Sequence, residues 1–269
     1  MATDPWIVII LAFMVFGVAF IYSNLGLGGG LLYVPILLSL TPYPKEVVVP
    51  ISLTFTIATS LSAMINHRRK GLVDFNLALV LLTGALVGAI LGVLFNLNVQ
   101  KEVFYAVFIT VVLLMASKML VDWIREARDE DRDDDSRMTI PRKIASSTGT
   151  LASGFTSGSL GIGGGLVNVP LMEYVLGRGA RRAIGTSSLM IVFTGAFGFL
   201  IYLFLGTPEP IDFNLITVLW PFVFVGAFVG SRWGLEKLKS RIVALIFIAV
   251  IFLAAAKMCV DLVQLLGLL

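Results

Sequence analysis

The chain has 269 residues, of which 58% are hydrophobic and only 14% are charged, and its formal net charge is +3. An average soluble domain carries about 25% charged residues, so this composition excludes an ordinary soluble protein. Several apolar runs approach the roughly 20 residues that cross a bilayer, and we expect an all-α, polytopic integral membrane protein. The single cysteine excludes an internal disulfide, and the chain also has only one histidine, so the sequence gives no basis for a metal site.

Five apolar segments of the first half are expected to be helical. They are residues 6–22, 31–40, 47–65, 76–95 and 103–124. The second segment has about ten residues, which rise only about 15 Å as a helix and cross half a bilayer. The third is expected to be interrupted near its start by Pro50. Asp74 or Asn76 is expected to cap the fourth.

A glycine-rich motif lies between the first two segments and recurs in the second half. Residues 25–35 read LGLGGGLLYVP and residues 160–170 read LGIGGGLVNVP, at an offset of 135. A glycine run breaks a helix and leaves free N–H groups at the start of the next one. Inside a membrane, unwound backbone is tolerated only where protein buries it or where it lines a cavity. We therefore expect a glycine-broken helix hairpin in each half, either re-entrant or discontinuous.

The second half repeats further features of the first in the same order. Asp212 and Asn214 match Asp74 and Asn76, Gly226 and Gly230 match Gly88 and Gly92, and Lys257 and Asp261 match Lys118 and Asp122. The offset drifts only from 135 to 139, which indicates an internal duplication. We expect two membrane repeats at 1–124 and 144–269, joined by a charged, solvated cytoplasmic linker at 125–143. Residues 144–158, 166–176 and 183–205 are expected to form the first helices of the second repeat.

The basic residues predict the topology. If each glycine break lies within a hairpin, the loops at 67–71, 125–143, 177–182 and 235–241 fall on one side, and with Arg232 they hold 16 of the 20 Lys and Arg residues. The positive-inside rule places this side in the cytoplasm. Both termini then lie in the extracellular or periplasmic space, and the two repeats are inverted. Whether residues 6–22 cross fully or form a re-entrant arm stays open. Both arrangements place every loop on the same side of the membrane, so the charges do not distinguish them.

The short helices that follow the glycine runs are expected to bind a small anion. Free N–H groups and the helix dipole both favour negative charge at a helix N-terminus. The candidate substrate-binding residues are Asn24, Gly28, Gly29, Gly30, Tyr33, Ser52, Thr54, Ser159, Gly163, Gly164, Gly165, Asn168, Thr186, Ser187 and Ser188. The alternative is that the glycines permit close helix crossing and that the hydroxyls bond back to their own helices.

Other patterns have structural explanations. Glycines at every fourth position predict a close-packing helix face, and they are Gly84, Gly88 and Gly92. The pairs Lys118–Asp122 and Lys257–Asp261 have the i,i+4 spacing of local salt bridges, with proton or substrate coupling as the alternative. Glu173 has no counterpart in the first half and is a candidate coupling carboxylate.

The sequence contains no motif for catalysis or for a cofactor. It has no G-x-x-x-x-G-K-[ST] P-loop, and residues 26–31 lack the third glycine of a dinucleotide fingerprint. We therefore expect a protein that is not an enzyme, with no catalytic residues and no cofactor. The expected partners are a small anionic substrate and the lipid bilayer but no nucleic acid, and both monomer and homodimer stay open.

The duplicated motif resembles the sulfite exporter TauE/SafE family of membrane permeases. The likeness rests on LGxGGGxxxxP in both halves, on the late Gly-x-x-x-Gly helices and on Gly185-Thr186-Ser187 after a basic loop, where the first half has Pro50-Ile51-Ser52 instead. It covers nearly the whole chain and implies transport of a sulfur-containing anion such as sulfite or an organosulfonate, for example sulfoacetate. We expect a secondary transporter, as an exporter, in a prokaryotic plasma (inner) membrane. An uncoupled anion channel or facilitator is the alternative.

Overall fold

The computed structural model describes residues 4–124, 139–237 and 241–266, and every regular element in this part of the chain is a helix. In chain order these are α1 (Pro5–Tyr22), α2 (Gly30–Leu40), α3 (Lys45–Arg69), α4 (Phe75–Asn98), α5 (Lys101–Ile124), α6 (Ile140–Leu160), α7 (Gly165–Pro170), the π-helix η2 (Leu171–Val175), α8 (Ala180–Leu205), α9 (Phe213–Lys237) and α10 (Arg241–Leu265). Within the described residues, five helices are long and apolar enough to cross a membrane: α1, α3, α4, α8 and the part of α9 from Phe213 to Trp233. The described part of the chain is therefore all-helical, as expected of a multi-pass membrane protein.

The helices pack into two compact units, and each unit draws on both halves of the sequence. The larger unit contains α1 to α4 and α6 to α9. The smaller unit contains α5 and α10, which pack against each other. The repeats predicted at 1–124 and 144–269 describe a duplication of sequence, which these packing units do not test.

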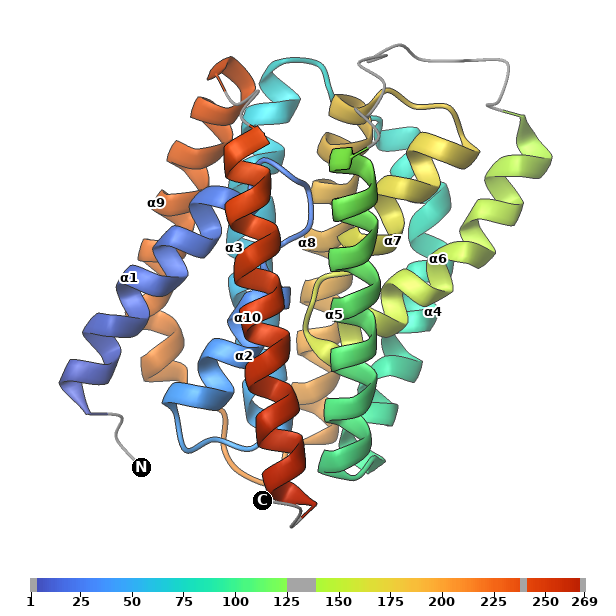
Figure 1. Ribbon diagram of the computed structural model, residues 1–269. Helices are drawn as coiled ribbons and strands as arrows, with labels where there is room; N and C mark the ends of the chain where they lie inside the picture. Colours follow the sequence, from blue (N-terminus) through green and yellow to red (C-terminus); the bar gives the residue numbers. More distant parts are fainter. Residues whose placement is uncertain (1–3, 125–138, 238–240, 267–269) are drawn as a thin grey trace. The chain divides into compact units, whose positions relative to one another are not determined.

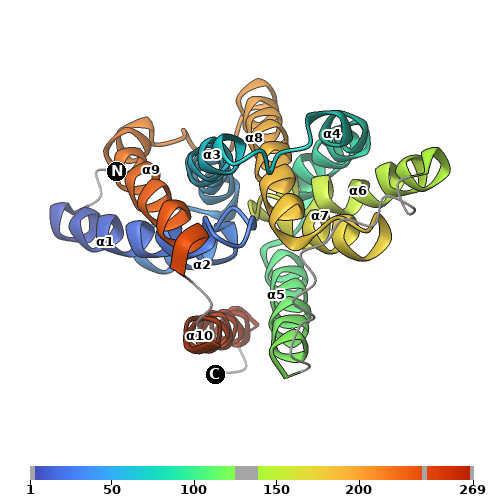
Figure 2. The same ribbon diagram turned by 90° about the horizontal axis from the view of Figure 1, so that it is seen from above.

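In the larger unit, α3 and α8 lie side by side at the centre and run in opposite directions (Figure 1). Figure 2 shows α1 and α9 on one side of this pair and α4 and α6 on the other. The connections from α3 to α4 and from η2 to α8 lie at one end of the unit, which we call the basic end, and those from α2 to α3 and from α8 to α9 lie at the opposite end. The loops at 67–71 and 177–182 thus share one end, although the side of a membrane that this end faces stays a prediction.

The glycine ladders form close helix contacts, as the sequence predicts. On α4, a side chain at Gly88 or Gly92 would overlap the carbonyl oxygen of a residue on α6, namely Leu151 or Phe155. On α9, the matching Gly226 and Gly230 meet the carbonyl oxygens of Phe16 and Phe20 on α1 in the same way. Small residues let helix backbones approach closely where no hydrophobic force drives association. Each half therefore packs its fourth helix on the first helix of the other half.

An aspartate begins the helix after each central helix. The Oδ1 atom of Asp74 accepts a hydrogen bond from the N–H of Leu77 at 3.0 Å, and Oδ1 of Asp212 accepts one from the N–H of Leu215 at 2.9 Å. Each bond satisfies one of the N–H groups left free at a helix start. Of the two predicted caps for α4, Asp74 is therefore the one that the structure shows.

Several predicted boundaries were wrong in detail. The predicted interruption at Pro50 is absent, because α3 continues through it from Lys45 to Arg69. The second short helix is divided, with the π-helix η2 following Pro170. The matching Pro35 stays within an α-helix, so proline alone does not produce the π turn. The predicted linker at 125–143 lies mostly outside the described residues, and α6 already begins at Ile140.

The i,i+4 pairs of the smaller unit agree with the local interpretation where they are described. Lys257 donates to both carboxylate oxygens of Asp261, at 2.8 and 3.1 Å, and the lysine side chain is 50% exposed. The side chain of Asp122, in the matching pair with Lys118, lies outside the described residues. Glu173 lies in η2 and is half-buried, and its predicted coupling role stays a prediction.

Candidate functional site

The two glycine loops, residues 26–30 and 161–165, lie buried at the centre of the larger unit. Gly26, Gly28 and Gly29 have positive φ angles of 64°, 80° and 88°, and three glycines of the second loop have similar values, Gly161 (69°), Gly163 (93°) and Gly164 (76°). Residues with a Cβ atom rarely adopt this backbone conformation, which explains why both runs consist of glycine. All ten residues of the two loops are buried, so protein encloses the unwound backbone.

The loops contact each other reciprocally. A side chain at Gly30 would overlap the carbonyl oxygen of Gly161, and one at Gly165 would overlap the carbonyl oxygen of Gly26. Gly30 matches Gly165, and Gly26 matches Gly161, at the offset of 135. The second contact is therefore the first one with the two halves of the chain exchanged. Such exchange is what a two-fold relation between two copies produces.

Two serines fix the loops to the central helices in the same reciprocal way. Ser52 on α3 donates to the carbonyl oxygen of Gly161 at 2.9 Å, and Ser187 on α8 donates to the carbonyl oxygen of Gly26 at 2.9 Å. Both serines are 0% exposed. Their hydroxyl protons are therefore used within the protein, and their first effect is to hold the loops in place.

The helices after the loops begin without a cap. In the first, the N–H groups of Leu32 and Tyr33 both bond to the carbonyl oxygen of Gly29, and in the second those of Val167 and Asn168 bond to that of Gly164. The N–H groups just before them, at 28–31 and 163–166, have no acceptor among the described residues. Buried N–H groups without an acceptor are rare, because each lost hydrogen bond costs about 1–3 kcal/mol. The loops therefore hold two sets of donors that a ligand can satisfy.

A buried amide follows the second loop. Both polar side-chain atoms of Asn168 have no hydrogen-bond partner among the described residues, although the residue is 0% exposed. At the matching position of the first half, the Tyr33 hydroxyl shares a 2.8 Å hydrogen bond with Thr59. Asn168 is thus the predicted site residue whose side chain is both buried and without a partner.

The other predicted site residues bond elsewhere. Three of them bond to carbonyl oxygens of their own helices: Thr54 to Ile51, Ser159 to Phe155 and Ser188 to Ile184. Asn24, in the turn after α1, donates to the carbonyl oxygen of Phe20. Thr186 accepts a hydrogen bond from the N–H of Asp74 at 3.0 Å, at the basic end. The structure thus brings together Gly28–Gly30, Gly163–Gly165, Ser52, Ser187, Tyr33 and Asn168. The part of all fifteen residues in binding a substrate stays a prediction.

Each end of the larger unit carries a contact between an aspartate and the other half. At the basic end, Nη2 of Arg178 lies 2.6 Å from Oδ2 of Asp74. At the opposite end, the Tyr43 hydroxyl donates to Oδ2 of Asp212 at 2.5 Å. A cavity of about 320 Å³ includes Asp74 in its lining and one of about 830 Å³ includes Asp212 and Tyr43. We call these two contacts the basic-end latch and the opposite-end latch.

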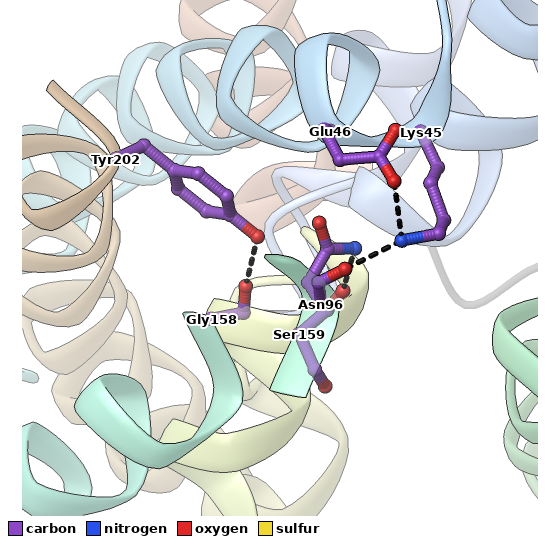
Figure 3. A network of polar contacts seen from close by, with 6 residues as sticks. All are labelled: Lys45, Glu46, Asn96, Gly158, Ser159 and Tyr202. Carbon is purple, nitrogen blue, oxygen red and sulfur yellow. Dashed lines mark hydrogen bonds and ion pairs between the residues drawn. The ribbon is translucent and has the colours of Figure 1, made fainter. Parts of the chain in front are cut away.

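A polar network that the sequence did not predict adjoins the second loop (Figure 3). Nζ of Lys45 lies 2.5 Å from the carbonyl oxygen of Asn96 and 2.6 Å from Oε1 of Glu46. Nδ2 of Asn96 donates to the carbonyl oxygen of Ser159 at 2.9 Å, and the Tyr202 hydroxyl donates to that of Gly158 at 2.8 Å. The sequence contained one signal. The predicted topology places the loops at 41–46, 96–102 and 206–212 on the side opposite the basic loops, and Lys45 and Lys101 are the only basic residues in these three loops.

Comparisons with known proteins relate the chain to membrane transporters. The chain is 29% identical over 113 residues to the probable membrane transporter protein MamO of Paramagnetospirillum magneticum (strain ATCC 700264 / AMB-1), and the match covers 40% of this chain and 18% of that relative. No solved structure matches the chain. The model of the sulfite exporter TauE/SafE family matches residues 11–258. The chain therefore belongs to the sulfite exporter TauE/SafE family of membrane transporters.

Proposed function

We propose that the protein is a secondary transporter that exports a small sulfur-containing anion, such as sulfite or an organosulfonate like sulfoacetate. The observation that carries the proposal is the pair of buried glycine loops, whose N–H groups at 28–31 and 163–166 have no acceptor in the described part of the chain. N–H groups at helix starts bind oxyanions without a cation beside them. The family description, the sulfite exporter, suggests the chemical class of the anion.

The mechanism proposed is alternating access around a site at mid-depth in the membrane. Supporting it, α3 and α8 run in opposite directions, and the contacts of the glycine loops and of the glycine ladders recur with the halves exchanged. This pattern fits two inverted repeats with a broken helix in each, an architecture of secondary transporters. The two latches lie at opposite ends, so opening one while the other stays closed would expose the site to one side at a time.

The proposed location is a prokaryotic inner membrane, with both termini outside and the basic end in the cytoplasm. The partners proposed are the anion and the lipid bilayer. The basic loops at 67–71 and 177–182 support this orientation, because cytoplasmic loops carry an excess of Lys and Arg. A cysteine introduced at Arg69, in a Cys259→Ser background that removes the exposed native thiol, should therefore react with membrane-permeant but not with impermeant reagents in intact cells.

A binding screen tests the proposed substrate class. Purified protein is heated with sulfite, sulfate, thiosulfate, sulfoacetate or taurine, and a ligand at 100 times its Kd should stabilise the fold by about 2.7 kcal/mol. Stabilisation by none of the five would contradict the substrate class. Flux from loaded liposomes then separates the mechanisms, because a transporter saturates with substrate, whereas a channel gives unsaturated, voltage-driven flux.

A further inference from the structure

Lys45 is buried although its position gives it a route to the surface. It is the first residue of α3, yet its side chain is only 2% exposed. A lysine at the end of a membrane helix usually extends its ammonium group to the interface, where water solvates the charge. Here the ammonium group turns inward to the Asn96 carbonyl oxygen and to Glu46, whose side chain is 18% exposed.

The buried ammonium group adjoins the second glycine loop. Asn96, which accepts from Lys45, donates through its side chain to Ser159, two residues before the loop begins. One turn further along α3, the carbonyl oxygen of Val49 lies 3.1 Å from the place that a Cβ atom on Gly161 would occupy. One helical turn rises about 5.4 Å, so the backbone of Lys45 lies about one turn from this contact with the loop, towards the opposite end of the unit.

The duplicated scaffold does not require this charge. The second half has Ala180 and Arg181 where the first has Lys45 and Glu46, and Ala180 begins α8 as Lys45 begins α3. A buried positive charge that the matching helix start of the other half lacks indicates a binding role.

We propose that Lys45 is the cationic recognition residue for the transported oxyanion, on its path between the opposite end and the glycine loops. This inference rests on the proposed function and adds to it a charged contact in one half only. Without an anion, the Glu46 carboxylate neutralises the ammonium group. A sulfite or sulfonate group carries the same charge-assisted hydrogen-bond acceptors as a carboxylate, so it exchanges with Glu46 for the ammonium protons.

The experiment compares Lys45→Gln with Glu46→Gln in the full-length protein, with sulfite as the probe and Kd measured by calorimetry. Lys45→Gln should raise Kd at least tenfold, because the charged donor is lost. Glu46→Gln should lower Kd severalfold, because the competing carboxylate is lost. Lys45→Arg should bind more tightly than Lys45→Gln. The matched control is Lys101→Gln, an exposed lysine at the first residue of α5, which should leave Kd unchanged.

The expected changes in Kd have opposite directions in Lys45→Gln and Glu46→Gln, and this difference separates anion recognition from a purely structural role. If Lys45→Gln melts like the parent protein and binds sulfite equally well, the inference is wrong. If Lys45→Gln does not fold, Glu46→Gln decides, and an unchanged or raised Kd overturns the inference. Failure of the parent protein to bind sulfite or any other sulfur anion of the screen would instead contradict the proposed function.

Discussion

The two ends of the larger unit use the same carboxylate position with different partners. Asp74 and Asp212 each cap a helix through Oδ1 and each use Oδ2 to hold a residue from the other half. At the basic end that residue is Arg178, and at the opposite end it is Tyr43, which occupies the matching position at the offset of 135. The two halves thus share the aspartate and the position of its partner, but the partner is a charged arginine at one end and a neutral tyrosine at the other.

The difference means that the two ends respond differently to the same condition. The Arg178–Asp74 latch is an ion pair with side chains 11% and 22% exposed, so salt weakens it to the extent that solvent reaches it. The Tyr43–Asp212 latch has a neutral donor, so it depends less on ionic strength and more on geometry. In the proposed alternating-access mechanism, the contacts that close the two ends therefore differ in strength.

The largest effect is expected from a change that disrupts the centre common to both ends. Gly30→Val would place a side chain on the Gly161 carbonyl oxygen, which is backbone and cannot rotate away. We expect loss of folded protein or loss of anion binding, measured by size-exclusion chromatography and thermal unfolding. The control is Gly17→Ala on α1, where a Cβ atom meets nothing within 4 Å and should stabilise the helix by up to about 1 kcal/mol. Normal folding and binding in Gly30→Val would show that the loops do not touch as described.

The next largest effect separates the two ends. Asp74→Asn keeps an acceptor for Leu77 but removes the charge opposite Arg178, at a cost of about 1–3 kcal/mol to the closed basic end. Asp212→Asn should weaken only the opposite end, and by less, because Tyr43 can still donate. Cysteines at Asn76 and Asn214, which line the two cavities, report opening by their rate of thiol labelling.

That labelling is read in a Cys259→Ser background, because Cys259 is an exposed free thiol. Asp74→Asn should speed labelling at position 76 and slow it at position 214, and Asp212→Asn should do the reverse. Faster labelling at both positions in one variant would contradict reciprocal opening of the ends and favour a continuous channel.

A smaller and equal effect is expected from the two matched serines. Ser52→Ala and Ser187→Ala each remove one neutral hydrogen bond to a loop carbonyl oxygen, worth about 0.5–1.5 kcal/mol. Anion affinity should fall about two- to tenfold in each, through a loosened loop. Calorimetry with the anion from the screen measures both variants. A large loss in one and none in the other would show that the loops contribute unequally to the site.

The sequence was most informative where the backbone imposes a rule. The positive φ angles of Gly28 and Gly163 and the close contacts of Gly88 and Gly226 require glycine, so spacing alone predicted the loops and the ladders. Asp74 was one of two predicted caps because its short carboxylate reaches an N–H group at a helix start.

Side-chain partners were less predictable, because they depend on tertiary contacts between distant segments. A hydroxyl such as Thr54 or Ser188 can face a ligand or its own helix at the same position in the sequence, and the structure shows both bonded to their own helices. The burial of Lys45 was missed for a related reason. From sequence alone, a lysine at a helix start is expected to lie at the membrane interface. Its burial follows from the tertiary contact with Asn96, which the sequence does not reveal.

The smallest effect is expected from the ion pair of the smaller unit, Lys257–Asp261. Comparing it with the Arg178–Asp74 latch shows how burial affects the strength of an ion pair. Nζ of Lys257 lies 2.8 Å from Oδ2 of Asp261, close to the 2.6 Å between Nη2 of Arg178 and Oδ2 of Asp74. The side chains of Lys257 and Asp261, however, are 50% and 26% exposed. Exposed pairs contribute about 0–1 kcal/mol, because solvent screens the charges and both side chains lose entropy. Asp261→Asn should therefore leave the melting temperature, the anion affinity and the proton dependence of transport nearly unchanged. Loss of proton-dependent transport with normal folding would instead identify this pair as a coupling site.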